Sequence, residues 1–137
     1  MLVIAWVALT MLARYSRDLP KGRSVLLGSP VHGSSIANQL VEKSVGKLIL
    51  GSARHGLTAG CQVPVGYEIG VIAGVGNKGV ARLFSKLPGP NDGTVTVAET
   101  SLPDATDRIE VECSHFGLLL SAEVANHCAR FLKQGKF

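Results

Sequence analysis

The sequence predicts an α/β fold with a mostly parallel sheet of about three or four strands and flanking helices. Short apolar runs that end at glycine or proline alternate with segments of helical periodicity, as in strand–helix–strand units. The 137 residues are 46% hydrophobic and 18% charged, which is enough for one core and excludes a disordered or collagen-like chain. Because the chain is short for two ordinary domains, we expect residues 1–137 to form a single domain.

The first half of the chain predicts one strand between helices. Residues 1–13 are apolar except for Thr10, and they are too few for a bilayer-spanning helix, which needs ~20 residues. We expect a buried helix over residues 2–16, with a targeting or membrane-associated segment as the alternative. Residues 23–28 form an apolar run that stops at Gly28, which predicts a buried strand. The next expected elements are a helix from Ser34 or Ser35 to Lys43, an apolar segment over residues 47–50 and a glycine-containing loop over residues 51–60.

The second half predicts further strands and a closing helix. Residues 67–73 predict a buried strand, and residues 108–113 alternate polar and apolar side chains, as a half-buried or edge strand does. Residues 94–98 carry β-branched side chains at alternating positions and predict a short extended segment. The expected helices cover residues 80–86 and the segment after the cap Ser121, the latter with Val124, Cys128, Phe131 and Leu132 on one apolar face and Lys133 near its end.

Charge and cysteine content exclude several kinds of partner. The formal net charge is +4, but the basic residues are scattered and aromatic residues make up only 5%, so we expect no nucleic-acid partner. The three cysteines, Cys61, Cys113 and Cys128, include no Cys-x-x-Cys pair. That pattern favours a reducing, cytoplasmic compartment and gives no metal site.

A glycine motif offers one functional alternative. Gly74, Gly76 and Gly79 form a Gly-x-Gly-x-x-Gly pattern between a predicted strand and a predicted helix. Such glycines let the backbone approach a pyrophosphate, and Glu99 follows at about the distance of a ribose-binding acid. The predicted helix is short before Pro88, so a glycine-rich structural turn explains the pattern better than a nucleotide site.

An acid and a histidine form the stronger functional signal. Asp92 lies in the turn Pro-Asn-Asp-Gly, and His115 follows the next predicted strand directly. This order is the one that ends a Ser…Asp…His hydrolase triad, in which the carboxylate fixes the imidazole tautomer. From spacing alone, Asp92 can equally serve as a turn residue and His115 can end the strand.

Four segments of the chain resemble the α/β-hydrolase superfamily, specifically its bacterial lipase- and esterase-like members. They are residues 25–34 (VLLGSPVHGS), 90–95 (PNDGTV), 114–119 (SHFGLL) and 124–137, in the family's order. The resemblance covers about residues 7–137. It implies a partial α/β-hydrolase fold and serine-based hydrolysis of a carboxylic ester, with no cofactor. By the same resemblance Asp92 orients His115, which acts as general base and then general acid.

The family's nucleophile motif, Gly-x-Ser-x-Gly, occurs nowhere in the sequence. The sequence therefore resembles the C-terminal part of a hydrolase, from a truncated reading frame or a degenerate relative, and we expect it to be inactive alone. Intact relatives would take an ester or lipid-like small molecule. A non-catalytic binding or membrane-associated protein on this scaffold is the alternative. An exposed sheet edge or the apolar helix of residues 1–13 would favour a homo-oligomer or membrane association.

Overall fold

The computed structural model describes residues 8–12, 14, 15, 17–31, 63, 65–76 and 87–137. Residues 8–12 and 14 are helical. The further elements, in chain order, are strands β1 (Arg23–Leu27), β2 (Glu68–Gly74) and β3 (Asp107–Val111), the 3-10 helix η2 (Gly117–Leu119) and the helix α6 (Ala122–Gln134). The predicted elements at residues 34–43, 47–50, 51–60 and 80–86 lie largely or wholly outside the described residues.

The three strands form a parallel sheet in the order β1-β2-β3. Gly70 of β2 lies opposite Val25 of β1, and Ile72 of β2 lies opposite Ile109 of β3. The central strand β2 is buried at every position after Glu68, because structure covers both faces of the sheet. The prediction of an α/β fold with a parallel sheet and flanking helices is confirmed, and each predicted strand lies within two residues of the observed one.

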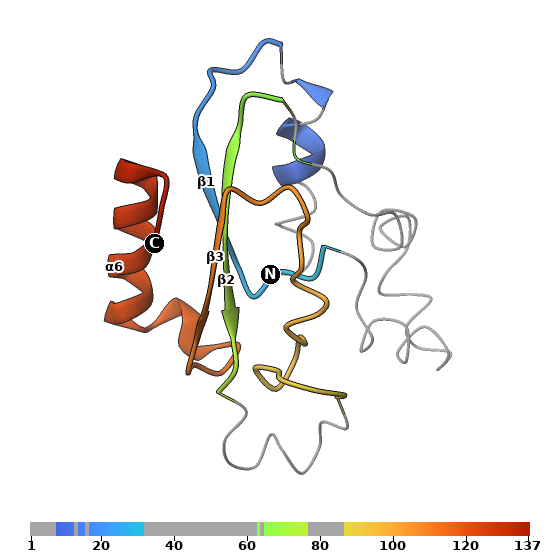
Figure 1. Ribbon diagram of the computed structural model, residues 1–137, viewed down its shortest axis with the longest axis vertical. Coiled ribbons are helices and arrows are strands. Elements are labelled where there is room, and N and C mark those ends of the chain that lie inside the picture. Colours follow the sequence, from blue (N-terminus) through green and yellow to red (C-terminus); the bar gives the residue numbers. More distant parts are fainter. Residues whose placement is uncertain (1–7, 13, 16, 32–62, 64, 77–86) are drawn as a thin grey trace.

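Helix α6 covers one face of the sheet (Figure 1). Its predicted cap is confirmed, since the Ser121 hydroxyl accepts a hydrogen bond from the Val124 N–H at 3.3 Å. Phe131 is fully buried and stacks on Phe137 with ring centroids 4.8 Å apart. Both rings lie over Gly70, where a Cβ would be 2.6 Å from Phe137 Cζ. A glycine at this position therefore lets the two rings approach the sheet.

The helical segment at residues 8–12 and the chain before β3 lie on the other face of the sheet (Figure 1). Apolar side chains from these two segments pack there against side chains from β1 and β2. Within that helical segment Leu9 is 2% exposed, whereas Met11 is 48% exposed. The described part of this helix is therefore buried on one side only, whereas the sequence predicts a fully buried helix. Over the described ranges, no helix is long and apolar enough to cross a bilayer. The buried residues of this cluster are Leu9, Leu26, Val31, Ile69, Val71 and Leu102.

Two local predictions differ from the structure. Residues 94–98 form turns, and only an isolated antiparallel bridge joins Asn91 to Thr96. The chain turns here because the Glu99 carboxylate accepts from Thr96 N–H at 2.7 Å while Thr96 Oγ1 accepts from Glu99 N–H at 3.2 Å. On α6, Leu132 is 50% exposed and so lies at the margin of the expected apolar face rather than within it.

Candidate active site

The carboxyl ends of the three strands meet at one edge of the sheet, beside Asp92 and His115. Gly28, directly after β1, has a φ of +49°, and a Cβ there would lie 3.0 Å from Asp92 Oδ2 and 3.2 Å from His115 Nδ1. At the end of β2, a Cβ on Gly74 would lie 2.7 Å from Asp92 Cβ. Asp92 lies in the connection between β2 and β3, and His115 follows β3. The parallel topology therefore brings the acid and the histidine to one place.

Asp92 and His115 form a close polar pair. His115 Nδ1 lies 2.7 Å from Asp92 Oδ2, and the His115 backbone N–H donates to the Asp92 carbonyl at 2.9 Å. The Asp92 side chain is only 1% exposed, whereas the His115 side chain is 18% exposed. The pairing of these two residues, predicted from their loops, is confirmed by this geometry. A buried carboxylate at this distance favours the tautomer in which Nδ1 carries the proton, which leaves Nε2 as the acceptor.

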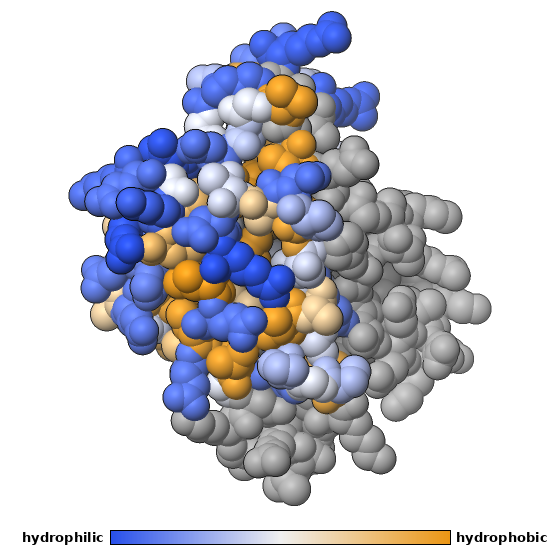
Figure 2. Space-filling model, viewed as in Figure 1, coloured by the Kyte–Doolittle hydropathy of each residue, from blue (hydrophilic) through white to orange (hydrophobic). Residues whose placement is uncertain are grey.

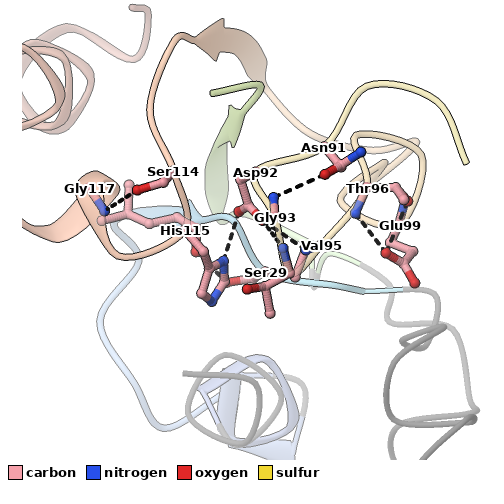
Figure 3. A network of polar contacts seen from close by, with 12 residues as sticks. Ser29, Asn91, Asp92, Gly93, Val95, Thr96, Glu99, Ser114, His115 and Gly117 are labelled. Atoms are coloured by element: carbon pink, nitrogen blue, oxygen red, sulfur yellow. Dashed lines mark hydrogen bonds and ion pairs between the residues drawn. The ribbon is translucent and has the colours of Figure 1, made fainter. Parts of the chain in front are cut away.

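The loop around Asp92 fixes the orientation of its carboxylate. Oδ1 accepts hydrogen bonds from the backbone N–H groups of Thr94 at 2.9 Å and Val95 at 2.7 Å. Figure 3 shows the carboxylate joined to His115 on one side and to its own loop on the other. Because each oxygen has a separate partner, the carboxylate cannot rotate without losing hydrogen bonds in a buried place. The pattern Asp-Gly-Thr-Val thus serves both as a turn and as the support of the acid.

The turn after His115 is fixed in a similar way. The Ser114 hydroxyl accepts from the Gly117 N–H at 3.2 Å, and the Ser114 carbonyl accepts from the Leu118 N–H at 3.0 Å. Leu118 is 1% exposed, and its Cδ1 would lie 2.8 Å from a Cβ on Gly28. The contact of Leu118 with the end of β1 anchors the histidine loop. Sequence reasoning missed this role of Gly28 and Leu118; the only available signal was a glycine at the end of an apolar run.

Among the described residues, no hydroxyl or thiol makes a hydrogen bond to Nε2 of His115. Ser29 follows the end of β1 closely and is only 5% exposed. Its hydroxyl donates to the Leu27 carbonyl at 3.1 Å. The described site therefore contains a carboxylate and an imidazole, and none of its described hydroxyl or thiol groups is hydrogen-bonded to the imidazole.

The glycine motif has a packing explanation. A Cβ on Gly74 would lie 2.6 Å from the carbonyl oxygen of Cys113, and a Cβ on Gly76 would lie 2.6 Å from the backbone carbon of Cys113. Both glycines are therefore needed where the end of β2 passes the chain that leaves β3. Glu99, the candidate ribose-binding acid, caps the turn at Thr96. Gly79 lies outside the described residues, and the remaining geometry does not favour a nucleotide site.

Comparison with known proteins supports the fold. No family model matches the sequence, and no curated protein matches it. The structure is similar to the crystal structure of Bacillus licheniformis lipase BlEst2 in mature form, with a TM-score of 0.62 and 19% sequence identity over 92% of this chain. The propeptide form of the same lipase matches with a TM-score of 0.55 and 20% identity over 82% of this chain. These matches show a lipase-like α/β fold.

The matched region is only part of the lipase. This chain covers 59% of the mature lipase and 30% of the propeptide form. The sequence thus corresponds in extent to about three-fifths of the mature lipase structure. This similarity shows a hydrolase-like scaffold.

Proposed function

We propose that residues 1–137 are a single, partial hydrolase domain that supplies the acid and base of a carboxylic-ester hydrolase. The observation that carries the proposal is the 2.7 Å contact of His115 Nδ1 with Asp92 Oδ2, with Oδ1 of the same carboxylate held by two backbone N–H groups. The lipase-like fold supports it, because the pair lies where parallel strands end, a common position for ligand sites in α/β folds.

In the proposed reaction His115 acts through Nε2, since Nδ1 is occupied by Asp92. Nε2 accepts the proton of an attacking hydroxyl, the imidazolium is stabilised by the Asp92 carboxylate, and the proton then passes to the leaving alcohol. The Asp92 carboxylate keeps its hydrogen bonds to the ring and to its own loop in each step. A serine hydroxyl is the nucleophile that this arrangement serves, and the sequence offers no Gly-x-Ser-x-Gly to supply it.

The 137-residue chain alone should therefore show no triad-dependent activity. Loss of the nucleophile from a complete serine-hydrolase triad lowers kcat by about 10⁶. We expect the purified chain to hydrolyse p-nitrophenyl butyrate no faster than its His115→Ala variant. A fluorophosphonate probe should label no serine. Labelling of Ser29, with a rate that falls in Ser29→Ala and His115→Ala alike, would instead identify a nucleophile within the chain.

A positive test uses the DNA upstream of the first codon. If it encodes a strand followed by Gly-x-Ser-x-Gly, in frame or after a frameshift, the extended protein should hydrolyse the ester. Its kcat should fall by several orders of magnitude in His115→Ala and Asp92→Asn. An active extended protein that tolerates both substitutions would rule out the proposed roles. Arg130→Gln provides a matched control, because Arg130 donates to the carbonyl of Phe137, away from the pair.

A further inference from the structure

The buried polar side chains of the described residues gather in one loop. Hydrophilic residues cover the surface over α6, on the left of Figure 2. Of the polar or charged residues that are buried in the described part of the chain, all but one lie between residues 91 and 100: Ser29, Asn91, Asp92, Thr96 and Thr100. A buried polar group is costly unless it is hydrogen-bonded, so the partners of these side chains show what each one holds in place.

Both ends of the Asn91 amide are bonded to the backbone of its own loop. Asn91 is 6% exposed, its Nδ2 donates to the Gly89 carbonyl at 2.8 Å, and its Oδ1 accepts from the Gly93 N–H at 3.0 Å. Because one partner is an acceptor and the other a donor, a carboxylate of the same shape could satisfy only one of them. Figure 3 shows the amide joined to Gly93, close to the Asp92 carboxylate.

The peptide group between Asp92 and Gly93 is held from both sides. Its N–H, which belongs to Gly93, donates to Asn91 Oδ1. Its C=O, which belongs to Asp92, accepts from the backbone N–H of His115 at 2.9 Å. A peptide group is planar and rigid, so it transmits the position of one end to the other. Asn91 is therefore connected to the backbone of the histidine through this single peptide group.

Gly93 would allow this peptide group to flip if nothing restrained it. Gly93 has a φ of +93°, and glycine adopts positive and negative φ about equally well. A flip would turn the Asp92 carbonyl away from the His115 N–H. The two N–H groups that bind Asp92 Oδ1 belong to the residues after Gly93 and do not restrain this peptide group. Asn91 opposes the flip, because the flip would leave its buried amide oxygen without a donor.

We propose that Asn91 is a positioning residue of the acid–base pair. It holds the peptide group between Asp92 and Gly93, which keeps the His115 backbone at the place where Nδ1 meets Asp92 Oδ2 at 2.7 Å. Asn91 itself takes no part in proton transfer. The use of the pair in ester hydrolysis rests on the proposed function, whereas the positioning of His115 by Asn91 does not.

The test compares two substitutions of Asn91 with one matched control. Asn91→Leu keeps a similar shape and lacks both hydrogen-bonding ends. Asn91→Ser keeps a hydroxyl that can accept from the Gly93 N–H, as serine does more weakly than asparagine in such turns. The control is Thr100→Val, because Thr100 is 2% exposed and its hydroxyl donates to the Val97 carbonyl at 2.8 Å. It also loses a buried hydrogen bond from a side chain to the backbone, but away from the peptide group of Gly93.

Two NMR measurements report the position of the histidine. One is the downfield resonance of the proton between His115 Nδ1 and Asp92, and the other is hydrogen exchange at the His115 backbone N–H. Each exchange rate is divided by that of the Ile72 N–H in the central strand, so that a loss of global stability cancels. Asn91→Leu should lose the resonance and raise this ratio by at least about tenfold. Thr100→Val should keep both values.

Asn91→Ser should give a partial rescue. Its downfield resonance should persist, and its exchange ratio should lie between those of the unchanged chain and Asn91→Leu. If Asn91→Leu does not fold, a raised ratio in Asn91→Ser supplies the same comparison with Thr100→Val. An unchanged resonance and ratio in the Asn91 variants would overturn the proposal. An equal loss in Thr100→Val would also overturn it, because the effect would then follow from any lost buried hydrogen bond.

The positioning role and the proposed function fail separately. In the active extended protein, Asn91→Leu should lower kcat for ester hydrolysis by at least about tenfold with little change in KM, because it displaces the base and leaves the binding of the ester unchanged. Hydrolysis that falls in His115→Ala but not in Asn91→Leu would reject the positioning role alone. NMR signals that depend on Asn91, together with hydrolysis that ignores His115, would reject the proposed function alone.

Discussion

Replacement of Gly28 by alanine tests whether the end of β1 supports the acid–base pair. Gly28 has a φ of +49°, and the left-handed region costs an L-residue about 1–2 kcal/mol. The new Cβ would lie 2.8 Å from Leu118 Cδ1 and 3.0 Å from Asp92 Oδ2, so the neighbours must move. Overpacking of this kind typically costs about 1–3 kcal/mol. We therefore expect Gly28→Ala to lower the free energy of unfolding by about 2–5 kcal/mol.

Two other glycines separate these contributions. Gly89 has a φ of +72° with nothing within 4 Å of its ideal Cβ, so Gly89→Ala should show the backbone cost alone, about 1–2 kcal/mol. Gly22 also has nothing within 4 Å and does not have a positive φ. Gly22→Ala should be neutral or slightly stabilising, by up to about 1 kcal/mol. Urea unfolding followed by circular dichroism measures all three variants.

The excess cost of Gly28→Ala over Gly89→Ala should appear at the pair itself. A proton in a short His–Asp hydrogen bond resonates far downfield in the NMR spectrum, and the displaced His115 and Asp92 of Gly28→Ala should lose that signal. Gly89→Ala should keep it. If Gly28→Ala and Gly89→Ala have equal stability and both keep the signal, then the end of β1 does not approach the pair.

Three further changes test other parts of the molecule. Phe137→Ala removes a ring that is 9% exposed and stacked in the core, so it should lower the free energy of unfolding in chemical denaturation by about 3–5 kcal/mol. Leu132→Ala, at a position that is 50% exposed, should lower it by under about 1 kcal/mol. Similar losses in the two variants would contradict the packing. Asp92→Asn should move the His115 proton from Nδ1 to Nε2, because the amide nitrogen that faces Nδ1 is a donor where the carboxylate oxygen is an acceptor. Nitrogen-15 chemical shifts report the tautomer, and an unchanged tautomer would refute the pairing. Burial raises the pKa of the Cys128 thiol. At a pH near the ordinary thiol pKa, iodoacetamide should therefore alkylate Cys128 more slowly in the native chain than in urea. The rate is measured on the peptide that contains Cys128. The free energy of unfolding should accordingly fall as pH rises past that ordinary pKa, because the unfolded thiol ionises first; equal alkylation rates would contradict the burial.

The sheet and the last helix could be predicted because each has a local signal. The strand β2 is a continuous apolar run between turn residues, and Ser121 precedes an apolar stripe of helical spacing. Residues 94–98 wrongly predict an extended segment, because their alternating β-branched side chains mask a second pattern. Thr96 and Glu99 have the spacing of a reciprocal cap, and in the structure their hydrogen bonds turn the chain.

The site was predictable only as far as topology decides it. Asp92 and His115 follow consecutive elements of a parallel sheet, so their loops emerge at one edge and can meet. The contacts of Gly28 and Leu118 depend on which strand lies beside which, and on how far each strand extends. No local pattern carries that information, because the approach of β1 to the histidine loop is set by pairing between residues far apart in the sequence.

The rigidity of the pair limits where a reaction partner can approach. Asp92 is held by backbone donors on Oδ1 and by His115 on Oδ2, and its side chain is 1% exposed, so it offers no surface to a ligand. The His115 side chain is 18% exposed, so within this pair only the histidine can be reached by a ligand. In the proposed reaction, a hydroxyl nucleophile and its ester would therefore meet the pair at the His115 ring and not at Asp92.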